Sequence, residues 1–324
     1  MELLKELTSA FGPSGRENCI RELIYTEATK YVDEVYTDTL GNLIAHKKGN
    51  GKKIMAAAHM DEIGAVITYI EDNGYLRFSA VGGLYNKDLN ARRVCFENGV
   101  CGVIGCDEDN KDRKLLKMFI DIGAADKKEA ESLVSVGDMC IFCGEFKEQG
   151  NIVISKALDN RAGCYVLLEA MKKADSDNDL YFVFTVQEEV GLRGAKTSAY
   201  GIMPDYAIAV DVTDTGDTPE NIKIATKIGG GACIKVMDRS VLCDSLIRSA
   251  LIELAKINKI DYQLEIMTDG GTDAGSIALT GTGVKTGGIS IPTRYIHSPS
   301  EMAGRKDLKD CCDLLTAFLN NKFE

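Results

Sequence analysis

The chain lacks several features that mark large classes of proteins. Its 324 residues include no tryptophan, and no apolar run approaches the roughly 18 residues that a membrane-spanning helix needs. Basic residues are in deficit, because 38 Lys and Arg stand against 49 Asp and Glu and leave a net charge of −11. Phosphate binding needs a basic surface, and the N-terminal residues carry glutamates and no apolar core of a signal peptide. Neither nucleic acid nor a membrane is therefore an expected partner.

The cysteines indicate a reducing compartment. All eleven are spaced irregularly, without the density of a small disulfide-bonded scaffold, and the odd count leaves at least one unpaired. Reduced thiols in a cytoplasmic protein are the simplest interpretation. One Cys-x-x-Cys motif, Cys140 to Cys143, falls in an expected strand that would point its two thiols to opposite sides, and no second pair has zinc-finger spacing. Core packing is the favoured interpretation of this motif.

In the first half of the chain, the pattern of apolar and polar residues changes after residue 65. An amphipathic helix is expected over 14–32, and two strands over 42–47 and 53–59 flank Gly49-Asn50-Gly51, whose Asn-Gly step predicts a hairpin turn. From 66 to 152, short apolar runs alternate with glycines and polar breaks, which predicts a β-rich unit with one helix near 127–133.

From about residue 153 the pattern alternates between strands and helices. Helices are expected at 160–174, 241–258 and 308–319, and strands at 180–187, 205–212, around 222–237 and at 284–291. Such alternation predicts an α/β fold with a mostly parallel sheet flanked by helices. Residues 1–65 and 153–324 would then form one α/β domain, interrupted by the insert at 66–152.

Histidines and acids follow several of these strands. His59 and Asp61 come after the first buried strand, Glu188 and Glu189 after a second, and Asp211 ends a third. In open α/β sheets the ligand site lies beyond the carboxyl ends of the strands, and imidazoles with carboxylates are ligands that zinc-like ions accept. The coincidence at strand ends predicts a metal site assembled by the fold.

Each of these residues also has an ordinary interpretation. His59 could be a strand-end histidine, the Glu188–Glu189 pair a solvated acidic loop, and Asp159 a helix N-cap. Asp211 could be a turn residue, and His297 a loop residue with an ordinary hydrogen bond. It is the convergence of all of them on one edge of a sheet that favours the metal site.

The adjacent carboxylates of Glu188 and Glu189 could have two different roles, metal binding and proton transfer. Two acids side by side are costly to bury unless cations compensate them, and a metal ion supplies that compensation. One of Glu188 and Glu189 could then bind the ion while the other accepts a proton from water. Asp61, two residues after His59, could fix the tautomer of that imidazole.

Other motifs carry little functional information. Gly229-Gly230-Gly231 lacks the Lys-Ser/Thr of a phosphate-binding loop, and no Gly-x-Ser-x-Gly nucleophile motif is present. His46 stands beside Lys47 and Lys48 and is expected to be solvated.

Five separated blocks of the sequence, in order and spanning nearly the whole chain, resemble the tetrahedral (TET-type) di-metal aminopeptidases, some of which are labelled glutamyl aminopeptidase or endoglucanase M. The blocks are His59-Met60-Asp61-Glu62-Ile63-Gly64, Leu158-Asp159-Asn160-Arg161, Gln187-Glu188-Glu189-Val190-Gly191-Leu192-Arg193-Gly194-Ala195, Asp211-Val212 and Arg294-Tyr295-Ile296-His297-Ser298.

The resemblance implies roles for these residues. One divalent ion, zinc or cobalt, would be held by His59, Asp159 and Asp211, and a second by Asp159, Glu189 and His297. Glu188 would be the general base, and Asp61 would orient His59. The implied activity is the removal of N-terminal residues from peptides, with a free α-amino group restricting cleavage to the first residue.

The resemblance also implies a fold and an assembly. The fold would be a zinc-peptidase-like α/β domain with an inserted β-barrel-like dimerisation domain, and dimers would form a hollow tetrahedral dodecamer. The Asp159–Asn160 peptide bond would be cis. The chain departs from the family in reading Gly82-Gly83-Leu84-Tyr85 where Gly-Gly-Trp is frequent, and in lacking a histidine often found in the insert. Both departures bear on assembly and not on the metal motifs.

Two other functions compete with a metalloaminopeptidase. A glycosidase would need two carboxylates flanking a sugar and no metal, so sensitivity to a chelator separates the two. A non-catalytic assembly or peptide-binding protein would have no need of a proton acceptor such as Glu188. The loop 268–275 and the stretch after Pro292 are expected to line the substrate pocket.

Overall fold

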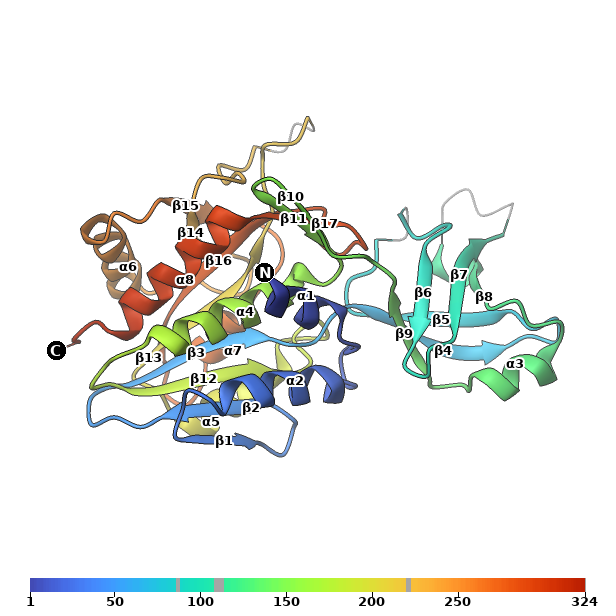
Figure 1. Cartoon of the computed structure of the whole chain (residues 1–324), viewed down its shortest axis with the longest axis horizontal. Helices are drawn as coiled ribbons and strands as arrows, with labels where there is room; N and C mark the ends of the chain where they lie inside the picture. The colour runs from blue at the N-terminus through green and yellow to red at the C-terminus, as the bar shows by residue number, and fades with distance from the viewer. Residues whose placement is uncertain (86–87, 108–113, 220–222, 324) are drawn as a thin grey trace.

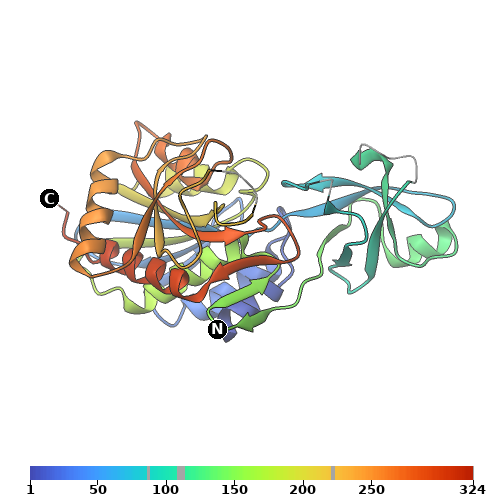
Figure 2. The same ribbon diagram turned by 90° about the horizontal axis from the view of Figure 1, so that it is seen from above.

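The computed structural model describes residues 1–85, 88–107, 114–219 and 223–323. The chain forms a large α/β layer from which a smaller β-barrel projects at one end (Figure 1). The C-terminus lies at the opposite end, as the view from above also shows (Figure 2).

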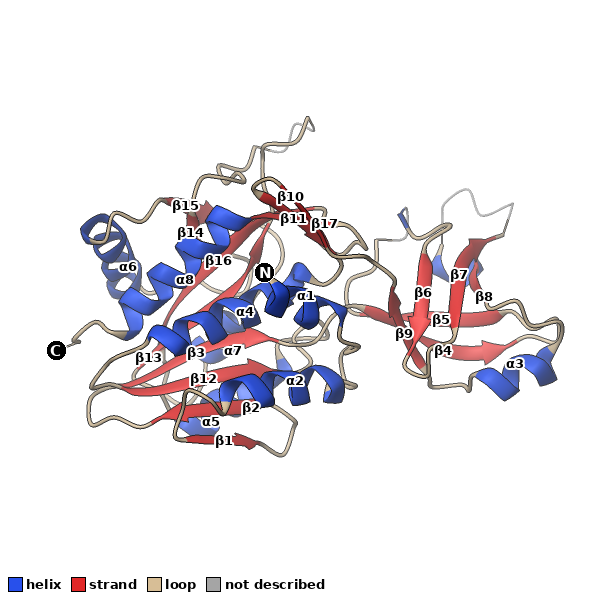
Figure 3. Ribbon diagram, in the orientation of Figure 1, coloured by secondary structure: helices blue, strands red, loops and turns tan. Residues whose placement is uncertain are grey.

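The large sheet has parallel strands at its centre and antiparallel strands at its edges. Its main path runs β1 (Glu34–Thr37), β2 (Leu43–Lys47), β12 (Asp179–Thr185), β3 (Lys53–His59), β13 (Tyr206–Thr213), β16 (Lys285–Arg294), β17 (Glu301–Gly304), β11 (Ile152–Ser155) and β10 (Lys147–Gln149). β14 (Ala232–Met237) pairs with β16 and with β15 (Tyr262–Ile266). β12, β3, β13 and β16 are mutually parallel neighbours (Figure 3). Their carboxyl ends therefore meet at one edge of the sheet.

Helices cover both faces of this sheet, and the sequence of β3 shows why. Ile54, Ala56 and Ala58 belong to one buried cluster and Met55 and Ala57 to another, because successive side chains of a strand point to opposite faces. The first cluster packs against α1 (Glu2–Ser9), α2 (Asn18–Ala28), α4 (Leu158–Lys173), α6 (Ser245–Ile257) and α8 (Arg305–Leu319). The second packs against α5 (Arg193–Ile202) and α7 (Asp273–Ala278). The apolar interior of β3, between Lys53 and His59, is thus buried on both sides.

The projecting unit is a closed six-stranded barrel. Its strand order is β4 (Gly64–Ile70), β5 (Leu76–Val81), β8 (Met118–Asp121), β7 (Cys101–Cys106), β6 (Arg93–Phe96) and β9 (Met139–Phe142). Ile67, Phe78, Ile104 and Ile120 lie in its own apolar core. α3 (Lys127–Leu133) and the short 3₁₀ turn η2 (Leu115–Lys117) complete it. The α/β fold with flanking helices and a barrel-like insert is as the sequence predicted, and α3 coincides with the one helix expected in the insert.

The predicted hairpin between 42–47 and 53–59 is wrong. β12 lies between β2 and β3, antiparallel to the first and parallel to the second. The Asn-Gly segment wraps instead around residues 177–178, where the N–H groups of Asn50 and Gly51 donate to the Asp177 carbonyl at 2.9 and 2.8 Å. A Cβ on Gly49 would lie 2.1 Å from the Asn178 carbonyl oxygen, so the glycine is needed for close approach of two backbones.

Three further expectations need correction. The helix expected over 14–32 is confined to α2, because Gly15 adopts a left-handed φ of 86° before it. The strand expected around 222–237 begins only at Ala232, and residue 222 lies outside the described residues. His46 is not solvated, since its ring stacks on Tyr181 with centroids 4.1 Å apart and its Nε2 lies 2.6 Å from Asp179 Oδ1. Tyr181 and Asp179 come from β12, the strand whose insertion the hairpin prediction missed.

In the described part of the chain, no helix has both the length and the apolar character needed to cross a membrane.

Candidate metal centre

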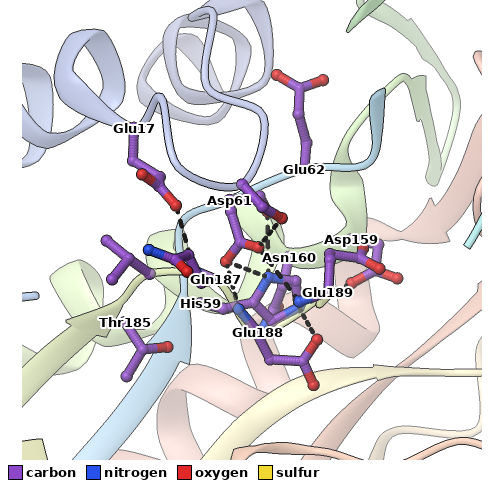
Figure 4. Close-up of polar contacts among 12 residues, drawn as sticks. Glu17, His59, Asp61, Glu62, Asp159, Asn160, Thr185, Gln187, Glu188 and Glu189 are labelled. Atoms are coloured by element: carbon purple, nitrogen blue, oxygen red, sulfur yellow. Dashed lines mark hydrogen bonds and ion pairs between the residues drawn. The ribbon is translucent and has the colours of Figure 1, made fainter. Parts of the chain in front are cut away.

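The predicted site residues meet where the parallel strands end. His59 is the last residue of β3 and is in register with Thr185, the last residue of β12. The turn after β12 brings Glu188 and Glu189 over this edge (Figure 4), and Asp211 lies near the end of β13. Strand polarity and register alone thus bring these side chains together.

Asp159 lies at the centre of the group. Its Oδ1 is 3.1 Å from His59 Nε2, and its Oδ2 is 3.3 Å from His297 Nε2. The peptide bond from Asp159 to Asn160 is cis, as expected from the sequence. The Asn160 side chain donates to the Val210 carbonyl at 2.8 Å, which ties the start of α4 to β13.

Two overlapping groups of ligand atoms surround this aspartate. His59 Nε2 lies 3.6 Å from Asp211 Oδ1 and 3.9 Å from Glu188 Oε2, while His297 Nε2 lies 3.3 Å from Glu189 Oε1. The sets His59–Asp159–Glu189 and His59–Glu188–Asp211 each keep three potential ligand atoms within 4.8 Å of one another. The structure therefore brings together all five predicted ligands and Glu188.

The charge of this group is unbalanced. Within the described chain, every ion pair made by Asp159, Glu188, Glu189 and Asp211 is with one of the two histidines. All four acids are largely buried, and Glu189 Oε1 has no hydrogen-bond partner. Four buried carboxylates against two imidazoles are a donor set that fits divalent cations.

The pKa values reflect this crowding. Burial raises the pKa of Glu188 well above its ordinary value, and the neighbouring acids raise it further. Burial likewise raises the pKa of Glu189 and of Asp211. Burial would lower the pKa of His59, but the carboxylates of Glu188, Asp211 and Asp159 hold it well above 6.5. Groups shifted this strongly in a cleft are typical of functional sites.

Asp61 does more than the sequence predicted. Its carboxylate accepts the backbone N–H groups of Glu188 at 3.0 Å and Glu189 at 3.2 Å, together with the Ser14 hydroxyl at 2.6 Å (Figure 4). His59 Nδ1 lies 3.1 Å from the Asp61 backbone carbonyl and 3.5 Å from Oδ1 of its carboxylate. The Asp61 side chain thus positions the Glu188–Glu189 turn, whereas the hydrogen bond to the imidazole is made by the Asp61 backbone carbonyl.

Glu301 is a buried acid that sequence analysis missed. Its Oε2 accepts the Asp159 N–H and its Oε1 accepts the His297 N–H, both at 2.9 Å. Tyr295 and His297 have left-handed φ values of 59° and 63°, which are uncommon for residues other than glycine. The bond to Glu301 holds this strained turn with the His297 ring directed at the cluster. The signal in the sequence was an acid four residues after the histidine.

A buried ionic group links the segments that carry the site. Glu62 points away from the cluster in Figure 4 and accepts two hydrogen bonds from Lys156 and one from Arg161. Arg161 also donates to backbone carbonyls at the end of α1, including that of Leu7. These contacts link α1, the segment after β3 and the start of α4, which carries Asp159.

A cavity of about 400 Å³ opens over the cluster. Besides the cluster, it is lined by residues that include Tyr85, Lys235, Asp238, Met267, Asp269 and Thr272. Asp269 and Thr272 belong to the loop expected to line the pocket, so that prediction is confirmed for the cavity. Lys235 is buried and paired with Glu265 and Asp238, which leaves its charge neutralised.

The barrel contributes to this cavity. The Gly82–Tyr85 segment after β5 packs on His297: a Cβ on Gly83 would lie 2.7 Å from His297 Nδ1, and the Tyr85 ring lies 5.8 Å from the imidazole. The Gly82–Tyr85 segment thus lies against a predicted metal ligand. The other motifs take no part in the cluster: Cys140 is in the barrel core, and His46 pairs with Asp179.

Comparisons with known proteins agree with this geometry. The family model for M42 glutamyl aminopeptidase matches residues 41–314. The chain is 56% identical, over 97% of its length and 96% of the relative's, to a putative aminopeptidase of Acetivibrio thermocellus. Among solved structures, an aminopeptidase of the archaeon Desulfurococcus kamchatkensis superposes with a TM-score of 0.95 at 42% identity, covering 98% of this chain and 94% of that one.

A second solved structure is relevant to assembly. The TET1 peptidase of Pyrococcus horikoshii, which can assemble into a tetrahedron or a large octahedral shell, superposes with a TM-score of 0.89 at 35% identity over 99% of each chain. The match of the family model over most of the sequence, and similarity over nearly the full length of each relative, show that this chain belongs to the M42 family of metal-dependent aminopeptidases.

Proposed function

We propose that the chain is a di-metal aminopeptidase that removes N-terminal residues from peptides. His59, Asp159 and Asp211 would hold one divalent ion, and Asp159, Glu189 and His297 the other, with zinc or cobalt as the metal. The observation that carries this proposal is the placement of Asp159, whose two carboxylate oxygens lie 3.1 and 3.3 Å from two different imidazoles. One carboxylate facing two ligand sets is what a shared pair of ions requires.

The metal ions would supply Lewis acidity, which lowers the pKa of water and polarises a carbonyl group. Glu188 is the residue assigned to proton transfer. Its carboxylate is buried and lies 3.9 Å from His59, and its backbone is held by Asp61. A carboxylate in this position can accept a proton from the attacking water and return it to the leaving amine.

The geometry of the turn supports this assignment. Because Glu188 and Glu189 are consecutive and both N–H groups bond to Asp61, their side chains diverge from one fixed point. Glu189 reaches His297, whereas Glu188 reaches His59. One acid can therefore serve the second ligand set while its neighbour remains available as the base.

We also propose that the barrel within the insert at 66–152 is a dimerisation domain and that residues 1–65 and 153–324 form the catalytic domain, whose sheet is extended by β10 from the end of the insert. Dimers would assemble into a tetrahedral dodecamer, as the ability of the Pyrococcus horikoshii relative to form a tetrahedron suggests. A cytoplasmic location is part of the same proposal.

A panel of aminoacyl p-nitroanilides tests the function. Purified protein should hydrolyse substrates with a free α-amino group, lose this activity on chelation, and regain it with added zinc or cobalt. The N-acetylated form of the best substrate should not be cleaved. Hydrolysis of a nitrophenyl cellobioside that survives chelation would indicate a glycosidase instead. A metal-loaded protein that turns over none of the substrates would indicate a non-catalytic binding protein.

A further inference from the structure

Three cysteines gather on the barrel, outside the metal centre. Cys95 is on β6, Cys101 is the first residue of β7, and Cys143 directly follows β9. β6 pairs with both other strands, so the three residues occupy adjacent strands (Figure 1). Cys143 is the half of the Cys-x-x-Cys motif that core packing does not explain, since it is only partly buried whereas Cys140 is fully buried.

The backbone places Cys95 and Cys101 directly opposite each other. They are paired residues of the β6–β7 hairpin, and the flanking Phe96 N–H donates to the Val100 carbonyl at 2.8 Å. This pattern marks a non-hydrogen-bonded pair, in which the two Cα atoms are about 4.5 Å apart. That separation lies within the range of about 4.4–6.8 Å that a disulfide can span.

The two sulfur atoms are already close. The Cys101 Sγ lies 3.6 Å from the Cys95 Sγ. Because a disulfide bond is about 2.05 Å long, rotation of the side chains by a small amount would bring the sulfurs to bonding distance without backbone movement.

Exposure distinguishes the two thiols. Cys101 is exposed and Cys95 is partly buried. Burial, together with the neighbouring thiols of Cys101 and Cys143, raises the pKa of Cys95 to about 11. The thiolate is the attacking species in disulfide exchange, so the first reaction with a reagent from solution falls to Cys101.

A metal site is a weaker interpretation of this cluster. Among the described residues, the groups whose ligand atoms lie close enough together to hold an ion contain no cysteine. Burial also raises the pKa of Cys143. The cluster therefore has one close pair of thiols, with sulfurs 3.6 Å apart, and a third thiol beside it, and not three converging thiolates.

We propose that Cys95 and Cys101 form a site of reversible disulfide formation that reacts with low-molecular-weight disulfides such as glutathione disulfide. The Cys101 thiolate attacks one sulfur of the reagent, forms a mixed disulfide and releases one thiol. The Cys95 thiolate then attacks the Cys101 sulfur and releases the second thiol. Two protein thiols lose two electrons and two protons in total, and one disulfide molecule is reduced to two thiols.

The site is independent of the proposed peptidase activity, and its test does not rely on turnover. Full-length protein is equilibrated with glutathione buffers of increasing disulfide content, quenched in acid and alkylated. Cleavage after Glu97 separates Cys95 from Cys101, and fragmentation between Gly102 and Gly105 distinguishes Cys101 from Cys106. The expected product is a Cys95–Cys101 link, with at least tenfold less alkylation of both thiols than in reduced protein.

Three variants make the result decisive. In Cys95→Ser, the glutathione adduct on Cys101 should accumulate, whereas the wild-type protein should show at least tenfold less of it. Cys143→Ser should still form the link. Cys19→Ser removes an exposed thiol on α2 and should not change the link. Thermal unfolding of each reduced variant verifies that the fold is retained.

Several results would overturn the proposal. A stable glutathione adduct on Cys101 in the wild-type protein would show that Cys95 does not close the bond. A disulfide from Cys143 to Cys95 or to Cys101, in place of the Cys95–Cys101 link, would show that the wrong pair was proposed. Protection of the three thiols from alkylation by added zinc, with no link formed, would favour a metal site.

Discussion

Replacement of Glu301 by glutamine tests whether a residue that touches no substrate positions two metal ligands. The carboxylate accepts the N–H groups of Asp159 and His297, each at 2.9 Å. Glutamine keeps the shape of the side chain and one acceptor oxygen, but its amide nitrogen faces an N–H donor. One charge-assisted hydrogen bond is lost, and such bonds contribute about 1.5–3 kcal/mol.

If this hydrogen bond holds Asp159 and His297 in place, its loss should weaken metal binding. A cost of about 1.5–3 kcal/mol corresponds to roughly a 10- to 150-fold rise in Kd, because each 1.4 kcal/mol is about tenfold. Competition with a chromophoric chelator measures the Kd for zinc or cobalt. At saturating metal, kcat should recover to within a few-fold of the wild-type value, since Glu301 does not take part in proton transfer.

A matched control separates positioning from a general effect of removing charge. Glu145 is 75% exposed in its side chain and pairs with Lys147, so Glu145→Gln should leave the metal Kd within twofold. The reasoning is refuted if Glu301→Gln lowers the melting temperature of the chelated protein but leaves metal affinity within twofold of the wild type. Glu301 would then contribute only to the stability of the fold.

Other predictions follow from the same geometry. Glu188→Gln should keep its metal content but lose at least about 10²–10⁴-fold in kcat, the usual contribution of general acid–base catalysis; near-normal turnover at full metal occupancy would remove Glu188 from this role. His297→Ala should weaken one ion more than the other in metal titrations, and equal affinities for both would count against His297 as a ligand. Burial raises the pKa of Asp273 from 3.8 to about 7. The folded protein therefore holds this proton at pH values where the unfolded chain has released it, and the free energy of unfolding falls as pH rises from 3.8 to about 7. Between pH 5 and 7 the chelated protein should lose about 2 kcal/mol from this group, seen as a drop of a few degrees in melting temperature relative to Asp273→Asn. A wild-type protein whose melting temperature follows that of the variant across this range would contradict the assignment.

The central sheet could be predicted because its buried strands are recognisable in the sequence as short apolar runs. The interiors of β3 and β12 are short, mostly apolar runs, and alternation of strands with helices predicts parallel neighbours. The site then follows, since residues after parallel strands meet at one edge. His59, Glu188 and Asp211 needed only strand polarity to be placed together.

The order of the strands could not be predicted in the same way. The Asn-Gly segment between β2 and β3 is a strong local hairpin signal, but it is overridden by β12, which is more than a hundred residues away in the sequence and pairs with both strands. The environment of His46 was missed for the same reason, because its partners Asp179 and Tyr181 are on β12.

Residues that act through backbone contacts were also beyond the sequence. Glu301 bonds to backbone N–H groups, so its place four residues after His297 does not by itself reveal that it accepts hydrogen bonds from Asp159 and His297. The packing of Gly83 and Tyr85 on His297 depends on how the barrel sits against the sheet. Such contacts become visible only when the two units are placed in space.

Anomalous diffraction from crystals of the metal-loaded protein tests the central claim most directly. Two peaks per chain are expected, one on each side of the Asp159 carboxylate, with His59 and Asp211 at the first and Glu189 and His297 at the second. Both peaks should disappear in Asp159→Asn. Peaks located elsewhere, or a single ion without contact to Asp159, would contradict the proposed centre.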